Sequence, residues 1–276
     1  MKLPVISKDQ REIAIDCHTH IHHEDVSLIE LILHCKNIGL NMLTITDFGE
    51  TNNFPLYEED RRKLEAKMGY SSERIKESAI VVYQHSDIPI FTLVRGQEIR
   101  TPQGDVLAIA PDQRVPTDRS LSYTLECMRD QGSIIIPPHP FTGIHSGIGR
   151  KNLEENLEFW DAIETFNAQN ICLFPIGPLN QTQSNNQAED FAEQYDKAKN
   201  ANSDAHRQIT EIARSHTYSA EQIDFTTLDR FQKTLRLALR DPTDLHEEHS
   251  SKYSFLKWAV PLYAQKIRSK FKKPRT

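Results

Sequence analysis

Residues 12–25 read "EIAIDCHTHIHHED", an apolar run followed by a crowd of histidines and carboxylates. The run over residues 12–17 predicts a buried β-strand, because buried strands form short continuous apolar blocks. His18 and His20 follow it two positions apart, and in an extended segment this spacing places both imidazoles on one face. Two imidazoles on one face are what a single metal ion requires, so the stretch indicates a metal site at a strand end.

Outward from this stretch, short apolar runs alternate with amphipathic stretches. Strands are predicted over residues 12–17, 41–47, 90–99, 105–110, 133–140, 161–167 and 201–206. Helices are predicted over residues 27–39, 58–87, 122–132, 153–160, 185–200 and 228–240. Such an alternation is typical of a largely parallel sheet covered by helices, either open or closed into a barrel. The predicted fold class is therefore α/β.

The length and composition favour one folded unit. The chain has 276 residues, of which 38% are hydrophobic and 26% charged, which suits one large domain with a small appendage. We expect a domain over residues 1–245 and a basic, amphipathic tail over residues 246–276. The four cysteines show no CxxC spacing and the N-terminus has no apolar signal segment, so we expect reduced thiols in a cytoplasmic protein.

Charge is unevenly spread along the chain. The net charge is -6, yet residues 252–276 contain Lys and Arg without Asp or Glu, so the body is more acidic than the total suggests. An acidic body is not typical of a general nucleic-acid binder. Three interpretations of the tail stay open: a helix packed on the domain, a peripheral contact with a membrane or anionic partner, and a local contact with nucleic acid.

Side chains that bind metals recur where the predicted strands begin or end. Besides His18 and His20 they are Asp47, Glu98, Asp105, His139, Asp204 and His206. In parallel α/β barrels the C-terminal strand ends form the active site, so we expect most of these side chains to converge. Imidazoles and carboxylates without a cysteine cluster suit Zn, Mn or Fe. Carboxylates shared between two ions would allow a pair that activates water and binds a phosphoryl group.

Five motifs in a fixed order carry a family resemblance. They are "DCHTH" (16–20), "TITDF" (44–48), "RGQEI" (95–99), "PPHPF" (137–141) and "NSDAH" (202–206). With Asp25 five residues after His20, the sequence resembles the PHP family of polymerase and histidinol phosphatase metallophosphoesterases. The resemblance covers about residues 12–218, and five ordered motifs are far more specific than one HxH pair.

The resemblance implies a distorted (β/α)7 barrel of the PHP type that holds up to three divalent ions. It assigns the first ion to His18, His20, Glu98 and Asp204. It assigns the second ion to Glu98, as a bridge, together with His139 and Asp105. It assigns a third position to Asp25 and His206.

Two positions depart from the family pattern. Phe48 stands where the family has a histidine, so we expect two ions and a weakened third position. Asp105 also stands where a histidine is usual, and a carboxylate there favours harder ions such as Mn or Fe. Asp47, His22 or His23 would be substitutes for the missing ligand; otherwise His22 and His23 are loop residues that face solvent or substrate.

Three carboxylates have structural interpretations as well. Asp25 would be the N-cap of a helix that starts near Val26. Asp105 would be a turn residue after Gly104. Asp47 would orient a neighbouring ligand rather than bind an ion.

A phosphate-binding group is expected near the metals. Arginine forks match phosphate oxygens, and Arg150 and Arg207 stand beside the motifs of His139 and Asp204. His145 shares the glycine-containing loop of Arg150, which lacks the ending of a P-loop. The alternative for all three is an ordinary surface position.

The predicted function is that of a metal-dependent hydrolase acting on a phosphomonoester or nucleotide through metal-activated water. The candidate catalytic residues are Glu98, His139, Asp204, Arg150 and Arg207. The acidic body favours a small phosphorylated substrate. Two alternatives stay open: a degenerate PHP domain that binds a metal or ligand without turnover, and a nuclease acting on nucleic-acid ends. Substrate, native metal and oligomeric state are not specified by the sequence.

Overall fold

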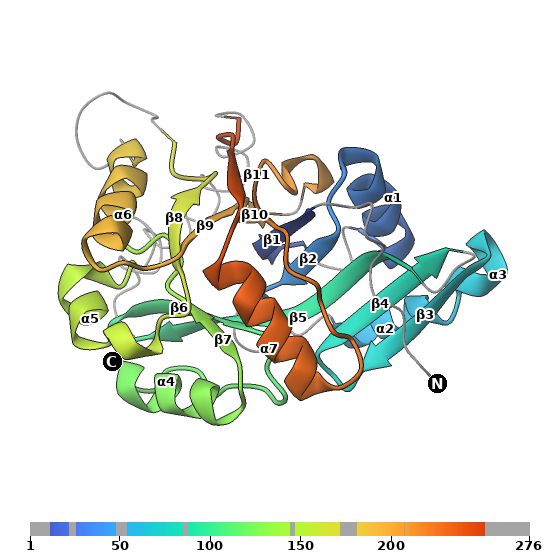
Figure 1. The fold of residues 1–276 in the computed structure, drawn as a ribbon, viewed down its shortest axis with the longest axis horizontal. Helices are drawn as coiled ribbons and strands as arrows, with labels where there is room; N and C mark the ends of the chain where they lie inside the picture. The colour runs from blue at the N-terminus through green and yellow to red at the C-terminus, as the bar shows by residue number, and fades with distance from the viewer. Residues whose placement is uncertain are drawn as a thin grey trace, which may run out of the picture.

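The computed structural model describes residues 12–21, 26–47, 54–84, 88–143, 147–171, 181–206 and 208–251. Over these residues the chain forms a mixed ten-stranded sheet and a separate two-stranded sheet, with helices around them (Figure 1). Within the same residues, no helix combines the length and the apolar character needed to cross a bilayer.

The elements follow one another in an α/β order. The strands are β1 (Ile13–His20), β2 (Met42–Ile45), β3 (Tyr70–Ile75), β4 (Ala79–Gln84), β5 (Pro89–Thr101), β6 (Gly104–Ile109), β7 (Ile134–Ile136), β8 (Ile163–Asn167), β9 (Lys199–Asn202), β10 (Ala205–His206), β11 (Ser215–Ser219) and β12 (Asp244–Glu247). The helices are α1 (Leu28–Ile38), α2 (Phe54–Arg61), α3 (Leu64–Met68), α4 (Leu121–Asp130), α5 (Gly149–Glu155), α6 (Thr182–Gln194) and α7 (Leu228–Arg240), with 3-10 turns η1 (Leu157–Phe159) and η2 (Ile209–Glu211).

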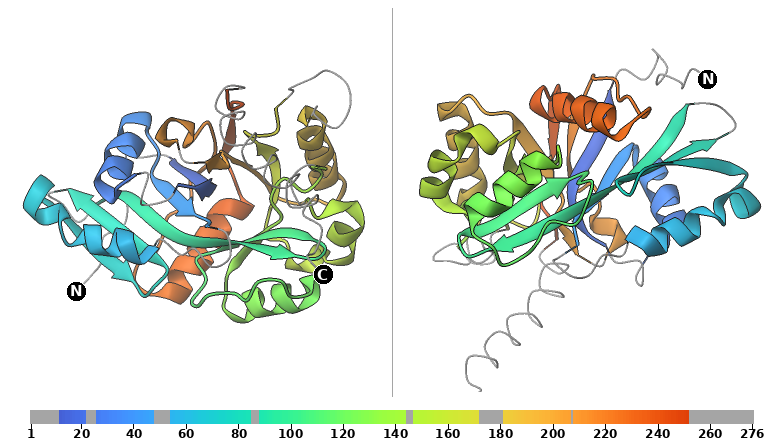
Figure 2. Two further views of the ribbon diagram at one scale, coloured as in Figure 1. Left: turned by 180° about the vertical axis from the view of Figure 1, so that it is seen from behind. Right: turned by 90° about the horizontal axis from the view of Figure 1, so that it is seen from below.

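The long strand β5 joins the two halves of the ten-stranded sheet (Figure 2). Its first half pairs with β2 in parallel and with β4 in antiparallel orientation, and its second half, from Gly96 on, pairs with β6. At this change of partner a Cβ on Gly96 would stand 2.6 Å from Thr44 Cγ2. Glycine is therefore required where β5 passes β2, two residues before Glu98.

The sheet of the described residues does not close into a barrel, so the expected (β/α)7 barrel is not confirmed. β8 and β9 pair only with each other, and isolated hydrogen bonds rather than a ladder connect them to their neighbours. Examples are Asp161 N to Ile135 O at 3.0 Å beside β7, and Cys17 N to Asn202 Oδ1 at 2.8 Å beside β1. The expectation of a largely parallel sheet is also wrong. Tight turns make β3–β4 and β5–β6 antiparallel hairpins, because a parallel pair needs a long crossover.

The predicted helix over residues 58–87 is only partly correct. Helices α2 and α3 occupy its beginning, but residues 70–84 form the hairpin β3–β4. β3 reads "YSSERI", and its polar residues face solvent on an edge strand, which conceals the strand pattern. The predicted helix over 185–200 likewise ends at Gln194, and its last residues form β9.

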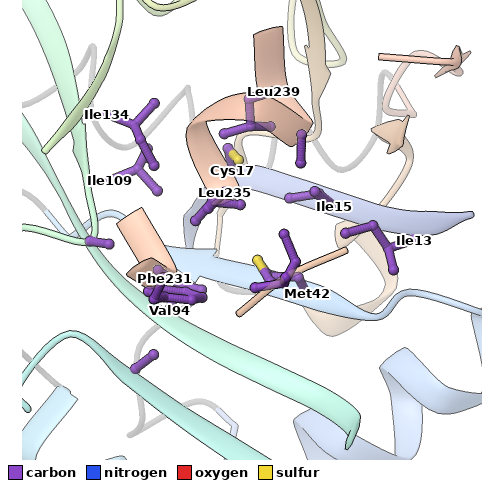
Figure 3. Packing of buried hydrophobic residues seen from close by; sticks show 14 of the residues in the cluster. Ile13, Ile15, Cys17, Met42, Val94, Ile109, Ile134, Phe231, Leu235 and Leu239 are labelled. Carbon is purple, nitrogen blue, oxygen red and sulfur yellow. The ribbon is translucent and has the colours of Figure 1, made fainter. Parts of the chain in front are cut away.

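Helix α7 has the predicted bounds and closes the main core. Phe231, Leu235 and Leu239 pack with Ile15 of β1 and with Ile134 of β7, which places the apolar face of the helix against the strands (Figure 3). Further along the chain, β12 continues the sheet across the expected boundary at residue 245, while residues 252–276 of the tail lie outside the described residues. Among the described cysteines, Cys17, Cys35 and Cys127 are not joined in disulfides.

Candidate metal centre

His18 and His20 converge at the end of β1, as their spacing predicts. Both side chains are buried, and their Nε2 atoms lie 3.1 Å apart. The Nδ1 atom of His18 lies 3.0 Å from Glu164 Oε1, so Nδ1 is the donor and Nε2 keeps its lone pair for the site in the neutral ring. A cation bound by both Nε2 atoms would satisfy this arrangement.

Glu98 stands between two groups of imidazoles. Its Oε2 lies 3.1 Å from His20 Nε2, and its Oε1 lies 3.2 Å from His139 Nε2. Asp204 adds a second carboxylate, with Oδ1 3.4 Å from His18 Nε2 and 3.6 Å from His20 Nε2. Four parts of the chain therefore place side chains at one point: β1, β5, the loop after β7 and the segment between β9 and β10.

Four overlapping groups have the spacing of metal ligands, with ligand atoms within 4.8 Å of one another in each. They are His18, His139 and Asp204; His18, His20 and Glu98; His20, Asp204 and His206; and Glu98, Asp105 and His139. Asp105 is buried within β6 opposite Arg100 of β5, so it is not a turn residue. Because β6 runs antiparallel to β5, its beginning lies beside the end of β5 and brings Asp105 to Glu98.

Two of the candidate ligands have an unusual backbone. His139 has φ 31° and Asp204 has φ 49°, in the left-handed region that non-glycine residues rarely occupy. Such positions cost about 1–3 kcal/mol each and persist where the surroundings hold them. The Asp204 amide donates to His18 O at 2.8 Å, and a Cβ on Gly147 would stand 2.9 Å from His139 O, so close backbone packing holds both loops.

The electrostatics of the centre are those of buried acids and imidazoles in contact. Burial lowers the pKa of His18, but Asp204 and Glu164 outweigh this effect and raise it well above the usual value. Burial favours a neutral Glu98, yet hydrogen bonds from His139, His18 and His20 hold its pKa well below the usual range. The buried carboxylates demand positive charge, which divalent ions would supply. Imidazole nitrogens with carboxylate oxygens fit Zn, Mn or Fe.

Two residues near the centre were not predicted from the sequence. Glu164 of β8 is buried and bonds to His18; its only signal is a carboxylate inside the apolar strand "AIETFN". Arg100 of β5 has its Nε 3.9 Å from Asp105 Oδ1, with 59% of its side chain exposed. It follows Glu98 by two positions on a strand, a spacing that places both on one face.

The other predicted residues divide into two sets. Asp47 is buried two residues after the end of β2. Arg150 contacts Glu154 and Gln194 and lies over Phe191, so its interactions are with α5 and α6. The N-cap of α1 is Ser27, which excludes that role for Asp25. Outside the described residues lie His22, His23, Asp25, Phe48, His145 and Arg207.

Comparison with known proteins finds similarities over parts of the chain. Residues 182–236 match the family described as PHP-associated. Two uncharacterized proteins of Methanocaldococcus jannaschii are similar: MJ1587 is 32% identical over 28% of this chain and 43% of its own length, and MJ0417 is 30% identical over 41% and 46%. The chain therefore matches less than half of each of these relatives.

Solved structures share the fold at low sequence identity. A two-domain protein from Bacteroides vulgatus that contains a predicted PHP-like metal-dependent phosphoesterase has a TM-score of 0.51 at 15% identity, over 87% of this chain and 65% of its own. PsfC from Pseudomonas syringae has a TM-score of 0.53 at 10% identity, over 94% and 100%. At these identities the likeness concerns the fold alone. Together with the PHP-associated match over residues 182–236, it makes the chain similar to PHP-domain proteins over part of its length.

Proposed function

We propose that the chain is a metal-dependent phosphoesterase that hydrolyses a small phosphomonoester at a centre of two divalent ions. The observation that carries the proposal is the position of Glu98. One of its oxygens faces His20 and the other faces His139, each at about hydrogen-bond distance. A carboxylate with its two oxygens in two ligand groups has the arrangement of a bridge between neighbouring ions.

The residues divide between two positions that share Glu98. His18, His20 and Asp204 would hold one ion, and His139 with Asp105 would hold the other. Bound ions would supply Lewis acidity and lower the pKa of a coordinated water, which is the chemistry phosphoester hydrolysis needs. The burial of the ligands keeps their charges poorly screened by bulk water and so strengthens their interactions.

Arg100 is a candidate to bind the phosphate of the substrate. Its guanidinium lies beside Asp105 yet remains largely exposed, so it could reach an incoming anion at the edge of the centre. The planar fork of arginine matches phosphate oxygens in pairs. Arg150 has Glu154 and Gln194 as its partners, and these belong to α5 and α6 rather than to the candidate metal centre.

A third ion is not required by this proposal. His20, Asp204 and His206 form a further group with ligand spacing, although two of these three residues also belong to other groups. In the second position, Asp105 replaces nitrogen with oxygen and favours Mn or Fe over Zn.

Metal stoichiometry and a matched substrate set test the proposal. The protein would be purified without chelator, supplied with Mn²⁺ or Zn²⁺, and compared with a His18→Ala/His20→Ala variant by elemental analysis. Activity would be measured on p-nitrophenyl phosphate, bis(p-nitrophenyl) phosphate and an end-labelled single-stranded oligonucleotide. Two equivalents of metal with monoester hydrolysis are expected. One equivalent or none, without turnover, would favour a binding module, and cleavage of the oligonucleotide alone would favour a nuclease.

A further inference from the structure

Glu164 occupies a central place among the ligands without being one of the candidate ligands. Its carboxylate is buried in β8 and receives hydrogen bonds from four directions. Oε1 lies 3.0 Å from His18 Nδ1 and 2.9 Å from Asn202 Nδ2. Oε2 lies 2.5 Å from the backbone N of His139 and 3.0 Å from Asn167 Nδ2. These partners belong to β1, the loop after β7, β8 and β9.

The contacts use the full hydrogen-bonding capacity of the carboxylate. An ionised carboxylate has about four acceptor positions, and four donors occupy them here. Glu164 is therefore fully engaged as an acceptor and has no lone pair left for an ion. Its role has to pass through the groups that donate to it.

The positions of three candidate metal ligands depend on these contacts. The hydrogen bond to His18 Nδ1 selects the tautomer in which Nδ1 carries the proton and Nε2 presents its lone pair to the centre. The bond from the His139 amide holds that residue at its left-handed φ of 31°. Asn167 Nδ2 donates to Asp204 Oδ2 at 3.2 Å as well as to Glu164, and so extends the network to a third ligand.

We propose that Glu164 is a positioning residue that aligns His18 and His139 directly, and Asp204 through Asn167, for metal binding. The inference rests on the proposed metal centre. In this proposal β8 supplies no candidate ligand, and its Glu164 side chain connects β1 with the loop after β7. The β8–β9 pair forms no strand ladder with the main sheet, and the Glu164 network adds to the isolated hydrogen bonds, such as the one from Cys17 N to Asn202 Oδ1, that connect the two.

Glu164→Gln is a selective test because it keeps size while exchanging one acceptor for a donor. Whichever way the glutamine amide is oriented, its NH2 group lies opposite two hydrogen-bond donors that in the wild type donate to a carboxylate oxygen. Asp161→Asn is the matched control: Asp161 is a buried carboxylate just before the same strand, and its partners are Ile135 N, Arg236 and Arg240, none of which is a candidate ligand. Both variants would be compared with the wild-type protein. The affinity for Zn²⁺ is measured by competition with a chelator, and the geometry of the site is monitored by the visible spectrum of bound Co²⁺.

We expect Glu164→Gln to weaken Zn²⁺ binding by about 10–100-fold and to alter the Co²⁺ spectrum, with Asp161→Asn within about threefold of wild type and spectrally unchanged. Wild-type affinity and spectrum in Glu164→Gln would overturn the inference while leaving the metal centre intact. Failure of the wild type to bind Zn²⁺ or Co²⁺ would instead overturn the proposed function. If circular dichroism shows that Glu164→Gln does not fold, Asn167→Ala decides: a several-fold weaker affinity supports the inference, and an unchanged one contradicts it.

Discussion

Two groups of histidines in this chain show opposite electrostatic behaviour. In the metal centre, acidic neighbours overcome burial and raise the pKa of His18 and of His139. In the second group, on β11 and β12, the rings of His216 and His246 are stacked with centroids 4.8 Å apart. There burial lowers the pKa of His216 to about 4.

The neighbours of each ring explain the difference. His216 contacts the ring of Tyr218 and the carbonyl oxygen of Ala213, and no carboxylate is recorded within ion-pair distance of it in the described part of the chain. Glu248 lies 3.9 Å from His246, at a half-exposed position. Interleaved buried carboxylates, rather than the number of imidazoles, therefore distinguish a candidate metal centre from a histidine stack.

Replacing each histidine pair by alanine should give the largest difference in effect on metal binding and activity. We expect His18→Ala/His20→Ala to lose bound metal and to lower activity on p-nitrophenyl phosphate by about 1,000-fold or more, because the first ion loses both imidazoles. His216→Ala/His246→Ala is the matched control and should retain metal. Elemental analysis and initial rates measure both effects, and equal metal loss in the two variants would remove the distinction.

Asp105 tests the carboxylate side of the comparison. Asp105→Asn should weaken the second ion by about 10–100-fold, because a neutral amide oxygen replaces a charged ligand. Asp105→His should restore affinity and shift preference from Mn²⁺ toward Zn²⁺. Titration of each variant with both ions, followed by competition with a chelator, measures the change. Unaltered affinity in Asp105→Asn would show that Asp105 is not a ligand.

Much of the centre can be predicted from the sequence because its ligands lie in short motifs beside strands. His18, His20, Glu98, His139 and Asp204 are predicted in this way and come together in the structure. Residues whose role depends on contacts between distant parts of the chain cannot be predicted in this way. Glu164 has no motif of its own, and its importance arises only when the fold brings its carboxylate to His18 of β1 and to His139 in the loop after β7.

The fold is predictable to a lesser extent for a related reason. Local patterns identify α1, α4 and α7, whose apolar faces repeat along one helix, and the hairpin formed by β5 and β6. They do not identify β3, because the polar residues of this edge strand face solvent. They also do not identify β11, because it is a mostly buried strand that reads "SHTYS" and contains no apolar run. Barrel closure depends on pairing between distant strands, which no local pattern encodes.

Arg100 should have a smaller effect than the ligands because it is exposed and solvent screens its charge. We expect Arg100→Gln to raise KM for p-nitrophenyl phosphate about tenfold with little change in kcat or bound metal, as for a group that binds ground and transition states alike. Arg150→Gln is the matched control and should leave KM unchanged. A rise in KM confined to Arg150→Gln would reverse the two assignments.

The smallest effect is expected at the histidine stack, as a pH dependence of stability. The folded pKa of His216, about 4, lies below its unfolded value near 6.5, so the unfolded state binds more protons between these pH values. The free energy of unfolding contributed by this ring is therefore present above pH 6.5 and is lost as pH falls toward 4. We expect His216→Gln to reduce the loss between pH 7 and pH 5 by about 1 kcal/mol. Urea denaturation of both proteins with chelator present measures the difference without a contribution from metal release, and identical pH slopes would show that His216 takes up its proton equally in both states.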